Sequence, residues 1–230
     1  MGEYSGQTDL ETVRIAQTVP IAAIESRRIA VFASGRGSDF QSLLDSNTKG
    51  ETNLDIALLV CNNREAFVIE RARNHGIPYV IIDHSGKERE EFDREVDSVL
   101  KDNDIGLIVL AGFMRILSPW FVKEWKGRIV NIHPALLPSF PGAHAHRDAL
   151  EHGVKVTGLT IHFVDEKVDH GPIIFQYPVE VKDYDTEETL SKRVLDQEHI
   201  WYPRVVQWIV DGRVNIEGRR VLINRPDRRP

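Results

Sequence analysis

The sequence predicts an α/β fold: an open, mostly parallel twisted sheet with helices on both faces, followed by a C-terminal helix and hairpin. Short apolar runs alternate with helix-like stretches through the first half of the chain. Most of these runs are apolar throughout, as strands covered on both faces should be. After about residue 172 the alternation gives way to long strands, one long helix and a short terminal hairpin.

The alternating half contains the elements of a parallel sheet. Strands are expected at residues 29–33, 56–61, 79–82, 106–110 and 129–132. Helices are expected at residues 39–46, 65–75 and 88–101. The run His75-Gly76-Ile77-Pro78 combines a helix end with a strand start. Strands and helices in this alternation form parallel strands joined by right-handed crossovers.

The second half is built differently. Two longer strands are expected at residues 160–164 and 173–181. Residues 185–188 (Asp-Thr-Glu-Glu) offer a capping box for a long helix that reaches about residue 210. Residues 213–223, broken at Glu217-Gly218, are typical of a hairpin.

The chain shows no sign of division into several domains. It has no internal repeat and no linker rich in Gly, Ser or Pro, so residues 28–230 are expected to form one domain. Residues 1–27 are expected to be an N-terminal extension, whose role the sequence leaves open. Asp9, Glu11 and Arg14 interrupt any signal-peptide core, and no apolar stretch approaches the roughly 18 residues of a membrane span. No membrane partner is expected.

Composition narrows the class of protein further. The apolar fraction of 41% and the charged fraction of 28% are ordinary for a soluble globular protein. A net charge of -6 argues against nucleic-acid binding as the main function, since phosphate contacts need Lys and Arg in excess. Cys61 is the only cysteine, so an internal disulfide is excluded and a cytoplasmic location is expected. Its apolar neighbours predict a buried thiol rather than a nucleophile.

The most informative residues are Asn131 and His133, in a segment that ends an apolar run. Two residues apart on an extended chain, their side chains point to the same side. They supply a hydrogen-bond donor and a group that can carry a proton near neutral pH. Asp169 ends a later strand-like stretch and could hold the imidazole in its charged form. Such a trio suits acyl transfer, although each residue alone could be an ordinary core or loop residue.

These residues also carry a family resemblance. The segment 131–138 resembles the catalytic loop of the folate-dependent formyltransferases, and residues 158–176 resemble that family's second signature. Residues 111–117 and 140–146 are most similar to the members that formylate glycinamide ribonucleotide. The motifs occur in the family's order from about Arg28 to about Gly212. The resemblance implies a Rossmann-like formyltransferase fold.

The resemblance implies a reaction as well. The formyl group of 10-formyltetrahydrofolate would pass directly to the amine of glycinamide ribonucleotide, a step of purine biosynthesis. Asn131 and His133 would stabilise the oxyanion of a tetrahedral intermediate, and Asp169 would favour the charged imidazole. Neither a covalent enzyme intermediate nor a metal is required. The histidines of the later segments lie apart and have no cysteine pair beside them, so no metal site is expected.

A glycine-containing loop follows the first strand. Glycines let the backbone approach a ligand, and the amides at a helix N-terminus attract anions. The loop lacks the full dinucleotide and triphosphate fingerprints, so from the residues alone a plain turn remains an alternative. The resemblance implies that it holds the phosphate of the ribonucleotide and that a late glutamate binds the ribose. The expected ribonucleotide-binding residues are Gly35, Gly37, Ser38, Asp39 and Glu198.

Asp39 departs from the family pattern, which often has Asn at this position. A carboxylate beside a phosphate would repel it, so Asp39 is expected to contribute its backbone amide and to cap its helix. The resemblance implies that the folate lies at the carboxyl end of the fourth alternating strand, where open α/β sheets bind ligands, and opposite the 165–169 loop. The expected folate-binding residues are Arg89, Met114, Arg115, Ile116, Leu117, Asn131, Asp165, Glu166, Lys167, Val168 and Asp169. For Arg89, a solvated helix face is an equal alternative.

Three other functions compete with this interpretation. A hydrolase that releases formate from the same folate would share the trio, but such hydrolases carry an N-terminal regulatory domain for which 27 residues are too few. A non-catalytic folate-binding module would not need all three polar residues. A methionyl-tRNA formyltransferase would need a further C-terminal domain. A homodimer is compatible with the sequence, which does not decide the oligomeric state.

Overall fold

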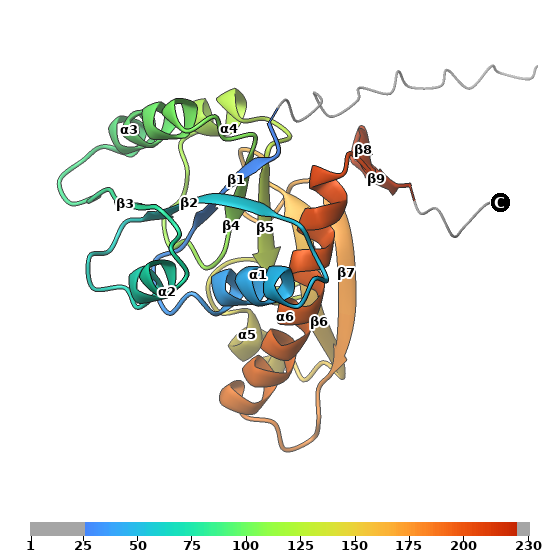
Figure 1. Cartoon of the computed structure of the whole chain (residues 1–230). Coiled ribbons are helices and arrows are strands. Elements are labelled where there is room, and N and C mark those ends of the chain that lie inside the picture. Colours follow the sequence, from blue (N-terminus) through green and yellow to red (C-terminus); the bar gives the residue numbers. More distant parts are fainter. Residues whose placement is uncertain (1–25, 225–230) are drawn as a thin grey trace, which may run out of the picture.

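A computed structural model describes residues 26–224 and shows one large sheet flanked by helices, with a small hairpin beside it (Figure 1). The strand order in the sheet is β3-β2-β1-β4-β5-β6-β7. Its strands are β1 (Arg28–Phe32), β2 (Asp55–Cys61), β3 (Tyr79–Ile81), β4 (Leu107–Leu110), β5 (Ile129–His133), β6 (Val156–Phe163) and β7 (Ile173–Glu180). The hairpin is formed by β8 (Val214–Glu217) and β9 (Arg220–Ile223). The predicted fold class and terminal hairpin are confirmed.

The helices within the described residues are α1 (Ser38–Thr48), α2 (Val68–Asn74), α3 (Arg89–Asp102), α4 (Pro119–Glu124), α5 (Ala145–Glu151) and α6 (Glu187–Val210). The predicted helices correspond to α1, α2, α3 and α6. The short helices α4 and α5 were not predicted. Of the predicted N-terminal extension, residues 1–25 lie outside the described residues.

The sheet changes character at β5. Strands β1 to β5 pair in parallel, whereas β6 pairs antiparallel with both β5 and β7. Strand β6 begins at Val156, four residues before the predicted start at Thr160. Gly158 lies in the added part, where a Cβ would meet the carbonyl oxygen of Tyr177 at 2.0 Å. The glycine that weakens the sequence pattern is therefore needed for the close approach of β6 and β7.

Helices cover the two faces of the sheet in separate layers. Phe40 of α1 and Val194 of α6 belong to one hydrophobic core, and Phe92 of α3 and Phe121 of α4 belong to the other. Figure 1 shows α3 and α4 together on one side and α1 and α6 on the other. Cys61 is buried in the α1–α6 core, as predicted for a structural thiol.

Helix α6 has a defined direction across the sheet. Its N-cap is Thr186, whose capping-box partner is Thr189. Near its other end, Val210 accepts a hydrogen bond from Arg27, the residue before β1 (3.1 Å). The helix therefore begins near the carboxyl ends of the parallel strands and ends near their amino ends.

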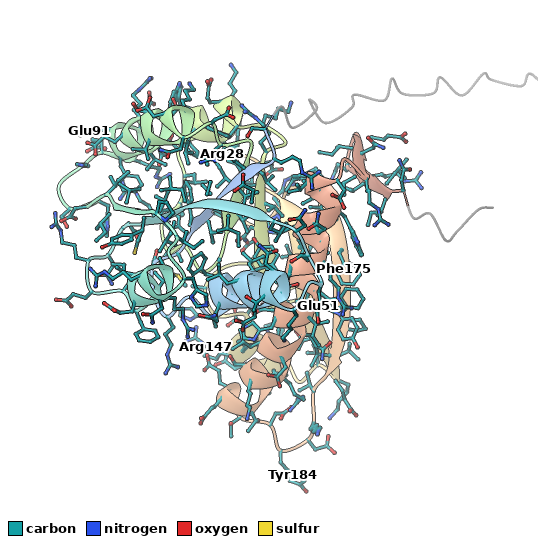
Figure 2. All side chains as sticks on the ribbon, viewed as in Figure 1. Arg28, Glu51, Glu91, Arg147, Phe175 and Tyr184 are labelled. Carbon is teal, nitrogen blue, oxygen red and sulfur yellow. The ribbon has the colours of Figure 1, made fainter. Side chains whose placement is uncertain are left out.

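Aromatic and hydrogen-bond contacts fix α6 in place. The Tyr202 hydroxyl donates to the carbonyl of Leu110 at 2.7 Å, which anchors the helix over β4. The ring of Phe175, labelled on β7 in Figure 2, lies 4.4 Å from the Trp201 ring between centroids. No helix among residues 26–224 is long and apolar enough to cross a lipid bilayer.

Candidate active site

The expected trio lies over β5 and β6, on the face that carries α3 and α4. Side chains alternate along β5, so that Val130 and Ile132 enter the α1–α6 core while Ile129 enters the α3–α4 core. Asn131 and His133 share the face of Ile129. Because β6 and β7 pair antiparallel, a short loop joins them, and this loop carries Asp169 to the same face.

Acceptors surround the imidazole of His133. Its Nε2 donates to the carbonyl of Phe140 at 2.8 Å, because a carbonyl can only accept. Its Nδ1 lies 3.4 Å from Oδ2 of Asp169, and both side chains are at least nine-tenths buried. One ring nitrogen therefore faces a carbonyl and the other faces a carboxylate. The predicted His133–Asp169 pair is therefore present as a direct contact.

The amide of Asn131 is oriented by His162, a residue of the second signature that was not predicted to belong to the site. His162 Nδ1 donates to the carbonyl of Phe163 at 2.8 Å, so its Nε2 can accept from Asn131 Nδ2 at 3.3 Å. Burial lowers the pKa of His162 and outweighs the hydrogen bond to Phe163 and the charge of Asp169, which act in the opposite direction. A neutral His162 leaves the second Nδ2 hydrogen of Asn131 for a ligand.

Asp169 is held in a strained backbone conformation. Its φ of 50° lies in the left-handed region, which is unfavourable for a residue other than glycine. Its Oδ2 accepts from the backbone N–H of Gly142 at 2.8 Å, so the 140–142 segment contacts both Asp169 and His133. Contacts from several segments therefore hold this carboxylate beside the imidazole.

Thr160 fixes the chain that follows His133. The Thr160 hydroxyl donates to the carbonyl of Ala135 at 2.6 Å and accepts from the N–H of Leu137 at 3.0 Å. Gln176 of β7 donates to the same hydroxyl at 3.0 Å and to the carbonyl of Leu137 at 2.8 Å. These bonds are buried or partly buried and make the loop after β5 a rigid support.

The candidate phosphate loop joins β1 to α1. Gly37 has φ 69° and ψ 38° and caps α1 without a side-chain hydrogen bond. A Cβ at this position would also meet Val68 Cγ2 at 2.4 Å, so the loop requires glycine on two grounds. Arg71 of α2 donates to the carbonyl of Arg36 at 2.8 Å, which places a cation against the loop. Ser38 is the first residue of α1, at its positive end.

The Asp39 side chain turns away from the loop and into the molecule. Asp39 and Glu198 are both buried where α1 packs against α6, and burial raises the pKa of Asp39 to about 6. Burial and the charge of Asp39 raise the pKa of Glu198 well above its usual value. Asp39 Oδ1 lies 3.8 Å from Nε2 of His199 and has no hydrogen-bond partner among the described residues. The predicted side-chain cap is wrong, since α1 has no such cap.

The candidate folate segment follows β4, next to β1 and β5 in the sheet. The Met114 N–H donates to Ser34 Oγ at 2.8 Å, which ties this segment to the start of the phosphate loop. The side chains of Met114 and Ile116 are 80% and 54% exposed, and Val168 in the other candidate folate loop is 55% exposed. Exposed apolar groups of this size around a reactive trio suit a flat ligand ring.

The remaining folate candidates differ in their surroundings. The guanidinium carbon of Arg115 lies 4.6 Å from the centre of the Phe92 ring, and Leu117 is buried in the α3–α4 core, so only backbone groups of these two residues could face a ligand. Arg89 is exposed at the start of α3. Asp165 stabilises its own loop by accepting from the N–H of Lys167 at 3.0 Å. Glu166 is exposed.

Sequence reasoning missed the orienting role of His162. The only signal was its position opposite Asn131, which requires the strand register. Within residues 26–224 no cluster of three or more His, Cys, Asp or Glu side chains could hold a metal ion.

Comparisons with known proteins identify the family of the chain. A family model described as formyl transferase matches residues 27–206. The chain is 49% identical over 190 residues to the trifunctional purine biosynthetic protein adenosine-3 of Gallus gallus, covering 82% of this chain but 19% of that protein. It therefore spans about a fifth of the length of that relative.

Two further matches cover most of both proteins. The phosphoribosylglycinamide formyltransferase of Escherichia coli (strain K12) is 42% identical over 189 residues, which cover 82% of this chain and 89% of that protein. The crystal structure of glycinamide ribonucleotide transformylase 1 from Symbiobacterium toebii superposes with a TM-score of 0.83 at 42% identity, covering 86% of this chain and 94% of that one. The chain belongs to the formyl transferase family.

Proposed function

We propose that this chain transfers the formyl group of 10-formyltetrahydrofolate to the glycinamide amine of 5'-phosphoribosylglycinamide. The products are formylglycinamide ribonucleotide and tetrahydrofolate, as in a step of purine biosynthesis. The observation that carries the proposal is the partly buried group of Asn131 and His133 at the end of β5 with Asp169 beside them, in a sheet whose β1–α1 loop suits a phosphate. Family membership and the name of the E. coli relative support the same reaction.

The chemistry follows from the donors around the trio. The substrate amine attacks the formyl carbon, and the formyl oxygen gains negative charge. Asn131 donates its free Nδ2 hydrogen to this oxygen, and His133 would donate the Nε2–H that otherwise bonds to the carbonyl of Phe140. Each well-placed donor of this kind contributes roughly 2.7–4 kcal/mol to transition-state stabilisation. Asp169 favours the protonated form of the imidazole.

Proton transfer completes the reaction. The attacking amine loses one proton, and the folate nitrogen gains one as its bond to the formyl carbon breaks. The His133–Asp169 pair, or a water beside it, carries this proton. The His162 ring keeps the Asn131 amide aligned while charge develops. The reaction needs no side-chain nucleophile.

The ribonucleotide would extend from the phosphate loop toward the trio. The backbone amides of Gly35, Gly37, Ser38 and Asp39 would receive the phosphate, and the carboxyl group of Glu198 would accept bonds from ribose hydroxyls. The folate would lie between the exposed side chains of Met114 and Val168. In this proposal the chain acts on small molecules in the cytoplasm and binds neither nucleic acid nor a membrane. Residues 1–27 precede a single catalytic domain.

The experiment that tests the function is a paired assay with 10-formyltetrahydrofolate, with and without glycinamide ribonucleotide, following tetrahydrofolate release. We expect turnover that depends on the ribonucleotide and falls by at least about a hundredfold in His133→Ala and Asp169→Asn. Asp183→Asn, an isosteric change at an exposed ion pair with Lys155, is the control and should stay active. Equal turnover without the ribonucleotide would instead identify a hydrolase, and folate binding without turnover would identify a binding module.

A further inference from the structure

A side chain of the β8–β9 hairpin contacts the candidate folate loop. Arg219 lies in the turn between the two strands, beyond residues 27–206, which the family model matches. Its Nη2 donates to the backbone carbonyl of His170 at 2.7 Å, across 49 residues of sequence. Its Nη1 lies 3.4 Å from both ring nitrogens of His170, so the guanidinium also rests against the imidazole.

The contact continues from His170 into the folate loop. His170 Nδ1 donates to Oδ2 of Asp165 at 2.7 Å, and Oδ1 of Asp165 accepts the Lys167 N–H at 3.0 Å. Burial raises the pKa of Asp165, but these hydrogen bonds and the charges of His170 and Arg219 outweigh it and lower the pKa overall. Asp165 is thus a charged acceptor at the centre of a small network. Arg219 is its outermost member.

The loop needs external support because of Asp169. This residue precedes His170 and holds a φ of 50°, which other contacts must stabilise. Gly142 holds the Asp169 side chain from one side, and Arg219 holds the next carbonyl from the other. If Arg219 were removed, Asp165 and His170 would keep their mutual hydrogen bond but lose their link to the hairpin.

We propose that Arg219 is a positioning residue that holds the 165–170 loop in the conformation that receives the folate. The inference rests on the proposed function, because it assigns the loop to folate binding. Arg219 acts through His170 and Asp165 and takes no part in the chemical step. Its loss is therefore expected to weaken the use of folate more than the use of the ribonucleotide.

The test compares three variants of the full chain. Arg219→Ala removes the contact, Arg219→Lys keeps a positive donor for the His170 carbonyl, and Arg220→Ala is the matched control. Arg220 is the next residue on the hairpin, is exposed, and makes no side-chain hydrogen bond or ion pair with a described residue. The measurements are KM for each substrate, kcat, the unfolding midpoint, and amide hydrogen exchange of residues 163–172.

We expect Arg219→Ala to raise the folate KM about fivefold, because the loss of one net hydrogen bond corresponds to a change of this size. The ribonucleotide KM should stay within about twofold of the wild-type value. Amide hydrogen exchange of residues 163–172 should be faster in Arg219→Ala than in the wild type. In both folate KM and exchange rate, Arg219→Lys should lie between Arg219→Ala and the wild type, and Arg220→Ala should equal the wild type. An unchanged folate KM in an active Arg219→Ala variant would overturn the inference. An equal rise in both KM values would also overturn it, since it would indicate a general loss of structure.

Failure of the inference and failure of the proposed function give different results. If the wild type shows no turnover that depends on the ribonucleotide, the proposed function fails, and the folate role of Arg219 fails with it. If the wild type is active and hydrogen exchange in the loop is unchanged by Arg219→Ala, only the inference fails.

Discussion

At the scale of single residues, the site combines charged groups with deep burial. Asp169 faces the His133 ring, so this buried carboxylate has a partner. Asp39 and Glu198 are two buried carboxyl groups whose ionised forms would repel each other, and the pKa of each is raised. His199 and Tyr202 of α6 also face Asp39. When ionised, the Asp39–Glu198 pair therefore lowers the free energy of unfolding, whereas the His133–Asp169 pair does not.

The pH dependence of stability should reveal this cost. Burial raises the pKa of Asp39 from 3.8 to about 6, so the folded state binds more protons than the unfolded state between these values. Stability therefore falls as pH rises through this window, by about 3 kcal/mol for two pKa units. Asp39→Asn removes the charge and also relieves Glu198. We expect the variant to be more stable than the wild type at pH 7, with the difference shrinking toward pH 4.

Urea unfolding of both proteins between pH 4 and pH 8 measures this difference. Asp102→Asn, a change at the exposed end of α3, is the control and should show no such trend. If the free energies of unfolding of Asp39→Asn and the wild type differed by the same amount at every pH, Asp39 would not titrate in this window.

The hydrogen bond between His162 and Asn131 makes a second prediction at this scale. His162→Ala leaves the Asn131 amide free to rotate, so we expect kcat to fall about tenfold, with the ribonucleotide KM changed by less than about twofold. His162→Gln restores an acceptor and should recover part of the loss. His84→Ala, which removes another imidazole bonded to a backbone carbonyl, is the control. Wild-type kcat in His162→Ala would refute the orienting role.

At the scale of elements, the β1–α1 loop depends on the position of α2. Gly37 and Gly50 both have positive φ, at 69° and 71°, but only Gly37 has a neighbour, Val68, within reach of a Cβ. Gly50→Ala should therefore cost about 1 kcal/mol from backbone strain alone. Gly37→Ala adds the clash with Val68 and should cost more.

The comparison of these two variants isolates the loop's role. Gly37→Ala should also raise the ribonucleotide KM, because α2 or the loop must shift to relieve the clash. Chemical denaturation and steady-state kinetics measure the two effects. Equal stability and equal KM in both variants would mean that the close approach to α2 is unimportant for the phosphate loop.

The elements also show what the sequence could and could not predict. Continuous apolar runs such as 29–33 and 129–132 identify buried strands, because a strand covered on both faces has no polar side. Helix α4 escaped prediction because six residues carry too little periodicity. Strand β6 appeared too short because Gly158 weakens its pattern. The predicted boundary of a strand is wrong where a residue such as Gly158 is required for contact with a neighbouring strand and does not fit the pattern of its own strand.

At the scale of the whole molecule, the trio was predicted from motifs, and its supporting contacts were not. Asn131 and His133 are two residues apart, so their common direction follows from strand geometry. His162 reaches Asn131 across 31 residues, and Arg219 reaches His170 across 49. Such contacts depend on sheet register and on where a hairpin packs, which one sequence does not specify. The burial of Asp39 against Glu198 depends likewise on how α1 packs against α6.

The change from parallel to antiparallel pairing at β5 also bears on protein design. A parallel β7 would require a crossover connection of a dozen or more residues after β6. The antiparallel pairing of β6 and β7 instead places a short loop beside Asn131 and His133. Under the proposed function, new sequences at residues 166–168 could therefore be grafted to alter the choice of formyl donor, while Asp165 and the strands beneath keep their contacts.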